Sequence, residues 1–217
     1  MMEFHKIELK NWNRSHTYEH FMTQIPCTYS MCVNLDITHL LQEVRRCQLK
    51  FFPIFLYGLS HVVNQHTEFR MDLNQDSEPG YYSVTHPYYT VLDPDTETFF
   101  NLWTCYDEDI RQFYANYLED QAKYGSSPQA AQQQAGVPNL FNVSCIPWVS
   151  FTGFNLNIGG SFDYLPPIFT VGKYFEQQGQ TLIPLSIQVH HAVCDGFHTS
   201  RFVNELQQWA DSFCWEK

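Results

Sequence analysis

The sequence predicts an α/β (α+β) two-layer sandwich, in which helices cover a mixed β-sheet. Apolar residues recur at helical spacing in several segments, and runs rich in β-branched and aromatic residues lie between those segments. Hydrophobic residues make up 44% of the 217 positions and charged residues only 16%, so the chain can bury a sizeable core. No repeat or low-complexity linker divides it, and we expect residues 1–217 to form a single domain.

Helices are predicted in four segments. Asp36 is placed to cap a helix over His39–Cys47, and Phe51–Gln65 follows as a mostly buried second helix. Residues 107–124 begin with acidic residues and continue with apolar residues at helical spacing. After Asp195, the apolar face of a closing helix consists of Phe202, Leu206, Trp209 and Phe213.

Strand-like runs fill much of the remainder. They are Cys27–Leu35, Tyr88–Leu92, Phe141–Val149, Phe154–Ile158 and Thr181–His191. Residues 126–138 differ, because Ser, Pro, Gln, Ala and Gly dominate them. That segment predicts a loop that leaves and rejoins the same domain.

Charge and cysteine content narrow the class of protein. The formal net charge of -11 argues against a broad phosphate-binding surface for DNA or RNA, so an anionic substrate needs local Lys or Arg. The first six residues have no apolar core and predict no secretory signal, and the apolar run Phe51–Leu59 is too short to span a bilayer. Seven cysteines, an odd number without a CxxC pair, indicate reduced thiols and therefore a cytoplasmic protein. The acidic charge and the lack of a spanning run predict that the protein binds neither nucleic acid nor membrane.

The last predicted strand ends in a histidine pair. Because side chains alternate between the two faces of a sheet, the apolar residues at alternate positions 183–189 share a face with His191. Ser186, Gln188 and His190 point to the other face. Desolvation at the end of an apolar stripe favours a neutral imidazole, which makes His191 a candidate general base.

The residue pattern alone leaves other interpretations open. His191 fits an ordinary core histidine before an Asp195-Gly196 turn equally well, and that Asp could brace the loop by pairing with an Arg. A metal site built from His190, His191, Cys194 and His198 is disfavoured, because adjacent strand residues face opposite sides. We therefore expect no metal.

Residues 188–198, Gln-Val-His-His-Ala-Val-Cys-Asp-Gly-Phe-His, resemble the HHxxxDG signature of the chloramphenicol acetyltransferase family. Further segments resemble that family in order along nearly the whole chain: 11–14, 27–29, 35–38, 50–53, 68–71, 96–99, 147–151, 154–157 and 172–174. The resemblance implies a chloramphenicol acetyltransferase-like fold. It also implies transfer of the acetyl group of acetyl-CoA to a hydroxyl of chloramphenicol, with no permanently bound cofactor.

The resemblance also assigns catalytic roles. His191 would be the general base for direct attack through a tetrahedral intermediate, and Ser144 would donate its hydroxyl to the oxyanion. Without the resemblance, Ser144 is an ordinary strand serine. Asp195 would pair with Arg14 as a brace for the loop, and Thr170 would position the intermediate through an ordered water.

Binding residues follow from the same resemblance. The expected coenzyme residues are Lys50, Trp148, Lys173 and Tyr174, in the absence of a P-loop or GxGxxG motif. The expected acceptor pocket consists of Phe21, Ile25, Tyr29, Phe99, Asn101, Phe154, Leu156 and Tyr164. Asn101 stands where the family usually has a small Ala or Ser, and Ala131 where a Phe can line the drug site. These departures, together with 79–82 and 158–160, put the identity of the acceptor in doubt.

Other proteins carry HHxxxDG. The acyltransferase cores of 2-oxo acid dehydrogenase complexes normally follow a lipoyl domain, which this chain does not show, and condensation domains and plant acyltransferases form a cleft between two lobes. A single lobe must complete its cleft with a neighbouring subunit, so we expect a closed ring oligomer. The resemblance implies that this oligomer is a homotrimer with active sites at subunit interfaces. The alternatives are acetylation of a different apolar alcohol or antibiotic, and a non-catalytic drug-binding homologue.

Overall fold

The computed structural model describes residues 3–134, 136–156 and 163–216. Its main element is a seven-stranded mixed sheet. The strand order is β2 (Thr28–Asp36), β10 (Gln180–His190), β8 (Ile168–Gly172), β7 (Leu140–Ile146), β5 (His86–Asp93) and β6 (Thr98–Trp103), with β9 (Phe175–Gln177) paired to β10. β7 is parallel to both of its neighbours and the remaining pairs are antiparallel.

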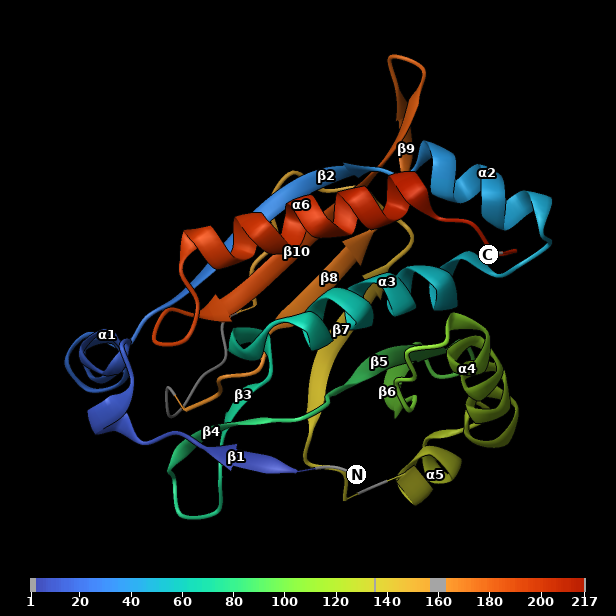
Figure 1. The fold of residues 1–217 in the computed structure, drawn as a ribbon. Helices are drawn as coiled ribbons and strands as arrows, with labels where there is room; N and C mark the ends of the chain where they lie inside the picture. Colours follow the sequence, from blue (N-terminus) through green and yellow to red (C-terminus); the bar gives the residue numbers. More distant parts are fainter. Residues whose placement is uncertain (1–2, 135, 157–162, 217) are drawn as a thin grey trace.

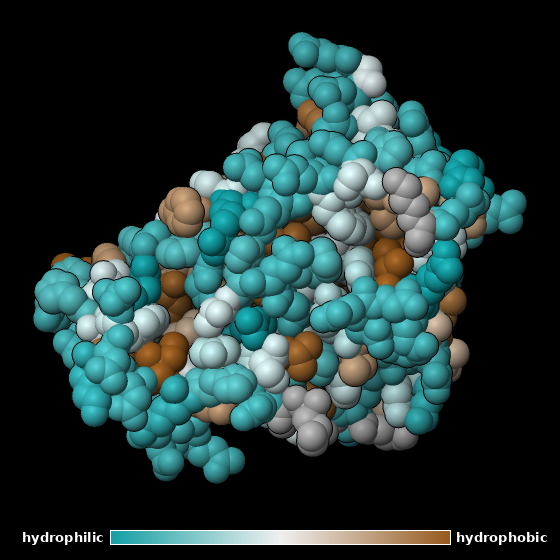
Figure 2. All heavy atoms as spheres, in the orientation of Figure 1, coloured by the Kyte–Doolittle hydropathy of each residue, from teal (hydrophilic) through white to brown (hydrophobic). Residues whose placement is uncertain are grey.

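Helices form the second layer. Those in front of the sheet in Figure 1 are α2 (Thr38–Arg46), α3 (Phe51–Gln65), α4 (Ile110–Tyr124) and α6 (Gly196–Ser212). α6 packs on β2, α3 packs between α6 and α4, and one buried apolar cluster fills the space between the layers. A mixed sheet covered by helices confirms the predicted two-layer sandwich, and the side of the molecule seen in Figure 2 is mostly hydrophilic.

Shorter elements complete the chain. A three-stranded sheet contains β1 (Phe4–Lys6), β4 (Pro79–Tyr82) and β3 (Met71–Leu73). The short helices are α1 (Ser15–Glu19) and α5 (Pro128–Ala131), and α1 continues as a π-helical turn over His20–Gln24. Short 3₁₀ turns lie at Leu9–Asn11, Thr67–Phe69 and Gln132–Gln134. α5 lies in the segment 126–138 that was predicted as loop. None of the helices in the described ranges is long and apolar enough to cross a membrane.

The four predicted helices are present, and acidic side chains bond to the first turn of two of them. Asp36, the predicted cap of α2, lies one residue before its N-cap Ile37, and Asp109, for which the sequence predicted only an acidic start, is the N-cap of α4. Asp36 accepts a hydrogen bond from the backbone N–H of Thr38 at 2.9 Å. Asp109 accepts one from Arg111 N–H, also at 2.9 Å. These side chains satisfy amides that the first helical turn leaves without an intrahelical acceptor.

Two strand predictions were wrong in part. β7 ends at Ile146, before Pro147, which has no N–H to give to a ladder. The predicted strand at Phe154–Ile158 has no strand structure over 154–156, and its remaining residues lie outside the described ones.

The reason for the second error is that side chains supply the hydrogen bonds of residues 154–156. Phe154 accepts a bond from Ser186 Oγ at 2.8 Å and donates one to Cys32 Sγ at 3.3 Å, and Leu156 N–H donates to Gln188 Oε1 at 2.9 Å. These partners lie on the sheet face opposite the helices. Residues 151–156 therefore form a strap that crosses this outer face.

Candidate active site

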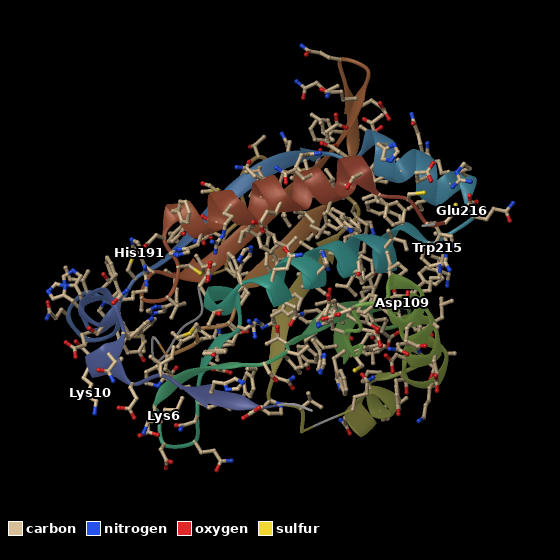
Figure 3. The ribbon with its side chains drawn as sticks, in the orientation of Figure 1. Lys6, Lys10, Asp109, His191, Trp215 and Glu216 are labelled. Atoms are coloured by element: carbon tan, nitrogen blue, oxygen red, sulfur yellow. The ribbon has the colours of Figure 1, made fainter. Side chains whose placement is uncertain are left out.

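His191 is the first residue after β10, so the strand predicted to include it ends one residue earlier. Its ring stacks on Phe21 with centroids 4.1 Å apart and meets the edge of Tyr29 at 5.3 Å. The side chain keeps 31% of its surface exposed. Figure 3 shows it where β10 ends, near α1. His191 is therefore held by aromatic contacts and still reachable from solvent.

Hydrogen bonding fixes the tautomer of His191. Nδ1 lies 3.1 Å from the carbonyl oxygen of Cys194 and 3.4 Å from Asp195 Oδ1. Both neighbours are acceptors, so Nδ1 carries the proton and donates it. Nε2 is then left with the lone pair that a general base needs.

Arg14 braces the loop that carries this histidine. Its Nη1 and Nη2 donate to the two carboxylate oxygens of Asp195 at 2.5 and 2.6 Å. Its Nη2 also donates to the carbonyl oxygen of His191 at 2.8 Å, and its Nε to that of Ala192 at 2.7 Å. The hydrogen bonds from Arg14 hold the pKa of Asp195 below its usual range. One guanidinium thus fixes both ends of the turn.

His198 holds the turn from the α6 side. The backbone N–H of Asp195 donates to His198 Nδ1 at 2.9 Å, which closes a capping box at the start of the helix. Burial lowers the pKa of His198, in keeping with a neutral ring that accepts this bond. Among the residues that the structure describes, no group of three or more His, Cys, Asp or Glu side chains is placed to hold a metal ion.

Ser144 lies in a different part of the molecule, where β5 and β7 diverge. The two strands pair only as far as Tyr89 and Val143, although β5 continues to Asp93 and β7 to Ile146. A cavity of about 760 Å³ occupies this gap. Its walls include Phe52 and Tyr117 from the helix layer and, from the strands and the turns beside them, Tyr89, Phe99, Ser144, Cys145 and Trp148.

The cavity therefore passes through the sheet. Tyr89 belongs to the core between sheet and helices. Ser144 faces the other side of the sheet, because it pairs with Thr170, and Thr170 pairs with Ser186 on the outer face. Burial raises the pKa of the Cys145 thiol to about 11, which keeps it protonated and makes it a poor nucleophile. Ser144 is one of the hydroxyl-bearing residues that line this passage.

Of the four expected coenzyme residues, only Trp148 lines the cavity, and contacts of neighbouring residues indicate where the other three lie. Lys173 N–H donates to the carbonyl of Val149, the residue after Trp148, at 2.9 Å. Tyr174 meets the edge of Phe51 at 6.1 Å, and Lys50 directly precedes that residue at the start of α3. Trp148 and Tyr174 are 61% and 40% exposed, so this region offers apolar rings beside two lysines.

The expected acceptor residues do not converge within one chain. Phe21 and Tyr29 contact His191, and Tyr29 and Phe154 line an outer-face hollow of about 540 Å³. Phe99 lines the large cavity, whereas Asn101 lines a separate hollow with Ala131. The remaining three are Ile25 and Leu156, which are exposed, and Tyr164, whose hydroxyl accepts a hydrogen bond from Asn142.

His191 and Ser144 are far apart. Ser144 and Ser186 lie in one row across the sheet, and His191 follows Ser186 by five residues along β10. At about 3.4 Å per residue, this places His191 roughly 17 Å beyond the row. One chain cannot bring both groups to the same carbonyl.

Sequence reasoning missed several residues of this arrangement. Thr90 and Cys145 line the cavity because β5 and β7 diverge, which no local pattern signals. The acceptor for His191 Nδ1 is a backbone carbonyl, so side-chain identity could not reveal it. Phe52 and Tyr117 carry the signal of core aromatics, and they are also cavity walls.

The family model and the sequence relatives indicate one family, and the solved structures show the same fold. The family model described as chloramphenicol acetyltransferase matches residues 2–207. A chloramphenicol acetyltransferase of Clostridium perfringens is 48% identical over 212 residues, covering 98% of this chain and 97% of that protein. One of Vibrio anguillarum is 47% identical, with 95% and 94% covered. Among solved structures, a chloramphenicol acetyltransferase has a TM-score of 0.85 at 22% identity over 96% of this chain and all of the other. The dihydrolipoamide acetyltransferase of Azotobacter vinelandii has a TM-score of 0.67 at 17% identity, covering 91% and 86%.

Proposed function

The chain belongs to the chloramphenicol acetyltransferase family, and from this premise we propose that it transfers the acetyl group of acetyl-CoA to a hydroxyl of chloramphenicol. The observation that carries the proposal is the geometry of His191. Its Nδ1 proton is donated to a carbonyl, its Nε2 lone pair is free to accept a proton, and its loop is fixed by Arg14. A histidine with only a structural role would not need a loop that Arg14 holds in place while the imidazole ring stays accessible to solvent.

In the proposed reaction, His191 Nε2 takes the proton of the acceptor hydroxyl as the hydroxyl oxygen attacks the thioester carbonyl. The carbonyl π pair moves to oxygen and gives a tetrahedral oxyanion, which the Ser144 hydroxyl stabilises by about 3 kcal/mol. Collapse of this intermediate breaks the carbon–sulfur bond. The thiolate of CoA then takes the proton from the His191 imidazolium, so the histidine returns to its neutral state.

Neighbouring groups support these roles. Thr170 pairs with Ser144 across β7 and β8, where its hydroxyl can hold a water beside the intermediate. Acetyl-CoA enters as a co-substrate along the region marked by Lys50, Trp148, Lys173 and Tyr174. No covalent acetyl-enzyme is required, since the acceptor oxygen attacks the thioester directly.

We propose a homotrimer in which His191 of one subunit faces the cavity of the next. Two observations support this. His191 and Ser144 lie too far apart to act together within one chain. Among the residues that the structure describes, eight large apolar side chains are exposed, and five of them are also expected substrate residues: Ile25, Phe99, Trp148, Leu156 and Tyr174. A partner subunit and the bound substrates would cover them.

Subunit mixing tests the shared site. Purified His191→Ala and Ser144→Ala proteins are each expected to be nearly inactive. After joint unfolding and refolding, mixed trimers should regain part of the activity, since some interfaces pair an intact His191 with an intact Ser144. No recovery, with a trimeric mass confirmed by light scattering, would show that both groups act within one chain.

A thiol-release assay tests the reaction itself. Acetyl-CoA and chloramphenicol should liberate free CoA with the acetyl group recovered on the drug, as measured by mass spectrometry. A panel of other aryl and alkyl alcohols shows how far the acceptor range extends. If only another alcohol is acetylated, that alcohol and not chloramphenicol is the acceptor. If no alcohol is acetylated, the proposal is refuted.

The remaining expectations are consistent with this role. We propose that residues 1–217 act as a single domain around one buried cluster, in the cytoplasm, and confer resistance to the antibiotic. All seven cysteines are free of disulfides, as a reducing compartment requires.

A further inference from the structure

Asn101 faces the same side of the sheet as Ser144. It pairs directly with Thr90 across β6 and β5. Tyr88 pairs with Asn142 across β5 and β7, so Thr90 and Ser144, each two residues further along, also face that side. Cys145 N–H reaches Thr90 Oγ1 at 3.4 Å across the gap. Asn101, Thr90 and Ser144 therefore form one row.

The row fixes the separation of its two ends. Neighbouring strands lie about 4.8 Å apart, so two spacings place Asn101 at least about 10 Å from Ser144, and the divergence of β5 and β7 adds to this. That is the length of a small aryl alcohol, measured from its reacting hydroxyl to the far end of its ring.

Asn101 opens into a hollow of about 540 Å³ at the edge of the sheet. Tyr88 and Trp103 form its strand side. The residues that cover it are Pro128, Ala131, Gln132, Gln134, Gly136 and Val137. Ala131, which is buried, contributes only a methyl group to the wall, so the hollow keeps room for a substituent.

Gln134 fixes the covering segment to β6. Its side chain accepts from Trp103 N–H at 3.0 Å and donates to Trp103 O at 2.9 Å and to Asp120 Oδ1 at 3.2 Å. Trp103 Nε1 also donates to the backbone carbonyl of Gln134 at 2.9 Å. The wall of the hollow is therefore built in advance of any ligand.

The Asn101 amide differs from that of Gln134. It is half-buried, and among the residues that the structure describes its side chain makes no hydrogen bond. A half-buried amide without a protein partner is free to exchange its hydrogen bond with water for one to a ligand, and such an exchange contributes about 1 kcal/mol.

We propose that Asn101 is a specificity-determining residue: its Nδ2 donates a hydrogen bond to a polar substituent at the end of the acceptor remote from the reacting hydroxyl. This inference rests on the proposed function, since it takes Ser144 as the place where the acceptor reacts. The substituent is an oxygen acceptor on the aryl ring, such as a nitro or a sulfonyl group. Asn101 thereby distinguishes aryl alcohols by their ring substituent, whereas His191 and Ser144 act only at the reacting hydroxyl and the thioester.

The test crosses enzyme variants with ring substituents. Asn101→Ala and wild type are compared on three aryl-propanediol acceptors that differ only at the para position: nitro, methylsulfonyl and hydrogen. We expect kcat/KM to fall about fivefold to tenfold for the nitro and methylsulfonyl compounds, mainly through KM, and to change less than about twofold for the unsubstituted one. Asn204→Ala, an exposed asparagine on α6, is the matched control and should leave all three values unchanged.

A second variant tests the hollow without removing the amide. Ala131→Phe should fill the space and penalise the methylsulfonyl compound more than the unsubstituted one. An equal loss on all three acceptors in Asn101→Ala, or no loss on any, would overturn the proposal. Equilibrium binding by calorimetry, without acetyl-CoA, gives the same comparison independently of turnover. Substituent-selective binding without any acetyl transfer would therefore refute the proposed function and leave the role of Asn101 standing.

Discussion

The loop around His191 and the gap between β5 and β7 are built in opposite ways. At His191, extra hydrogen bonds are added: Arg14 alone contributes four, to a carboxylate and two carbonyls. At Ser144, hydrogen bonds are given up, because two strands that pair as far as Tyr89 and Val143 then diverge. One region gains rigidity, and the other gains space.

The contrast shows what each proposed role demands. A general base must present one nitrogen in one orientation, and a side chain on a turn achieves that only with support from a distant element. An oxyanion donor that sits on a strand is already oriented by the sheet. What it needs is room for a substrate to reach it, and that room comes from unpaired backbone.

Removal of the base should produce the largest effect. His191→Ala is expected to lower kcat by about 10³-fold, in the range that general bases contribute, because no other group can take the acceptor proton. Its ring is partly exposed and its brace contacts use backbone atoms, so the melting temperature should change little. Steady-state thiol release and thermal unfolding measure the two quantities. Retention of more than a tenth of the activity would mean that another group is the base.

Loss of the oxyanion donor should come next. Ser144→Ala is expected to lower kcat by about 10²-fold to 10³-fold while KM for both substrates stays near its original value. Ser212→Ala, an exposed serine on α6, serves as the control. A change confined to KM would assign Ser144 to ground-state binding in place of the oxyanion.

Loosening of the brace should show in both stability and rate. Arg14→Lys keeps the charge but cannot reach Asp195 and two carbonyls together, so we expect unfolding to become easier by about 2 kcal/mol. This is below the value for a fully buried pair because the Asp195 side chain is 41% exposed. The displaced imidazole should lower kcat about tenfold. Urea unfolding and steady-state kinetics measure the two effects. Arg46→Lys, which changes an arginine in a surface ion pair, is the control and should change neither quantity much.

The smallest effect is a dependence on acidic pH. The pKa of Asp195 is lowered by Arg14, so the pair stabilises the fold fully above the unfolded pKa of about 3.9 and loses its effect as the pH falls through the folded value. Wild type should therefore exceed Asp195→Asn in unfolding free energy at pH 7, and the difference should shrink towards pH 3. A difference that stays constant over this range would mean that the carboxylate charge is not what stabilises the loop.

The sequence predicted the two regions unequally. Helix positions followed from apolar spacing and caps, and α3 has the predicted bounds, because local patterns determine such elements. The HHxxxDG run pointed to His191 without reference to any other element. By contrast, the divergence of β5 and β7 depends on which strands are neighbours. The hydrogen bonds that keep residues 154–156 out of a ladder come from three side chains on two other strands. Such contacts between distant parts of the chain leave no periodic signal.

The brace also has a consequence for synthesis of the protein. Arg14 and Asp195 are separated by 181 positions, so the first partner leaves the ribosome long before the second. Contacts of such wide separation form late, after most of the chain has collapsed. The orientation of His191 is thus among the last features to be completed. The proposed base is therefore oriented only after residues near both ends of the chain have come together.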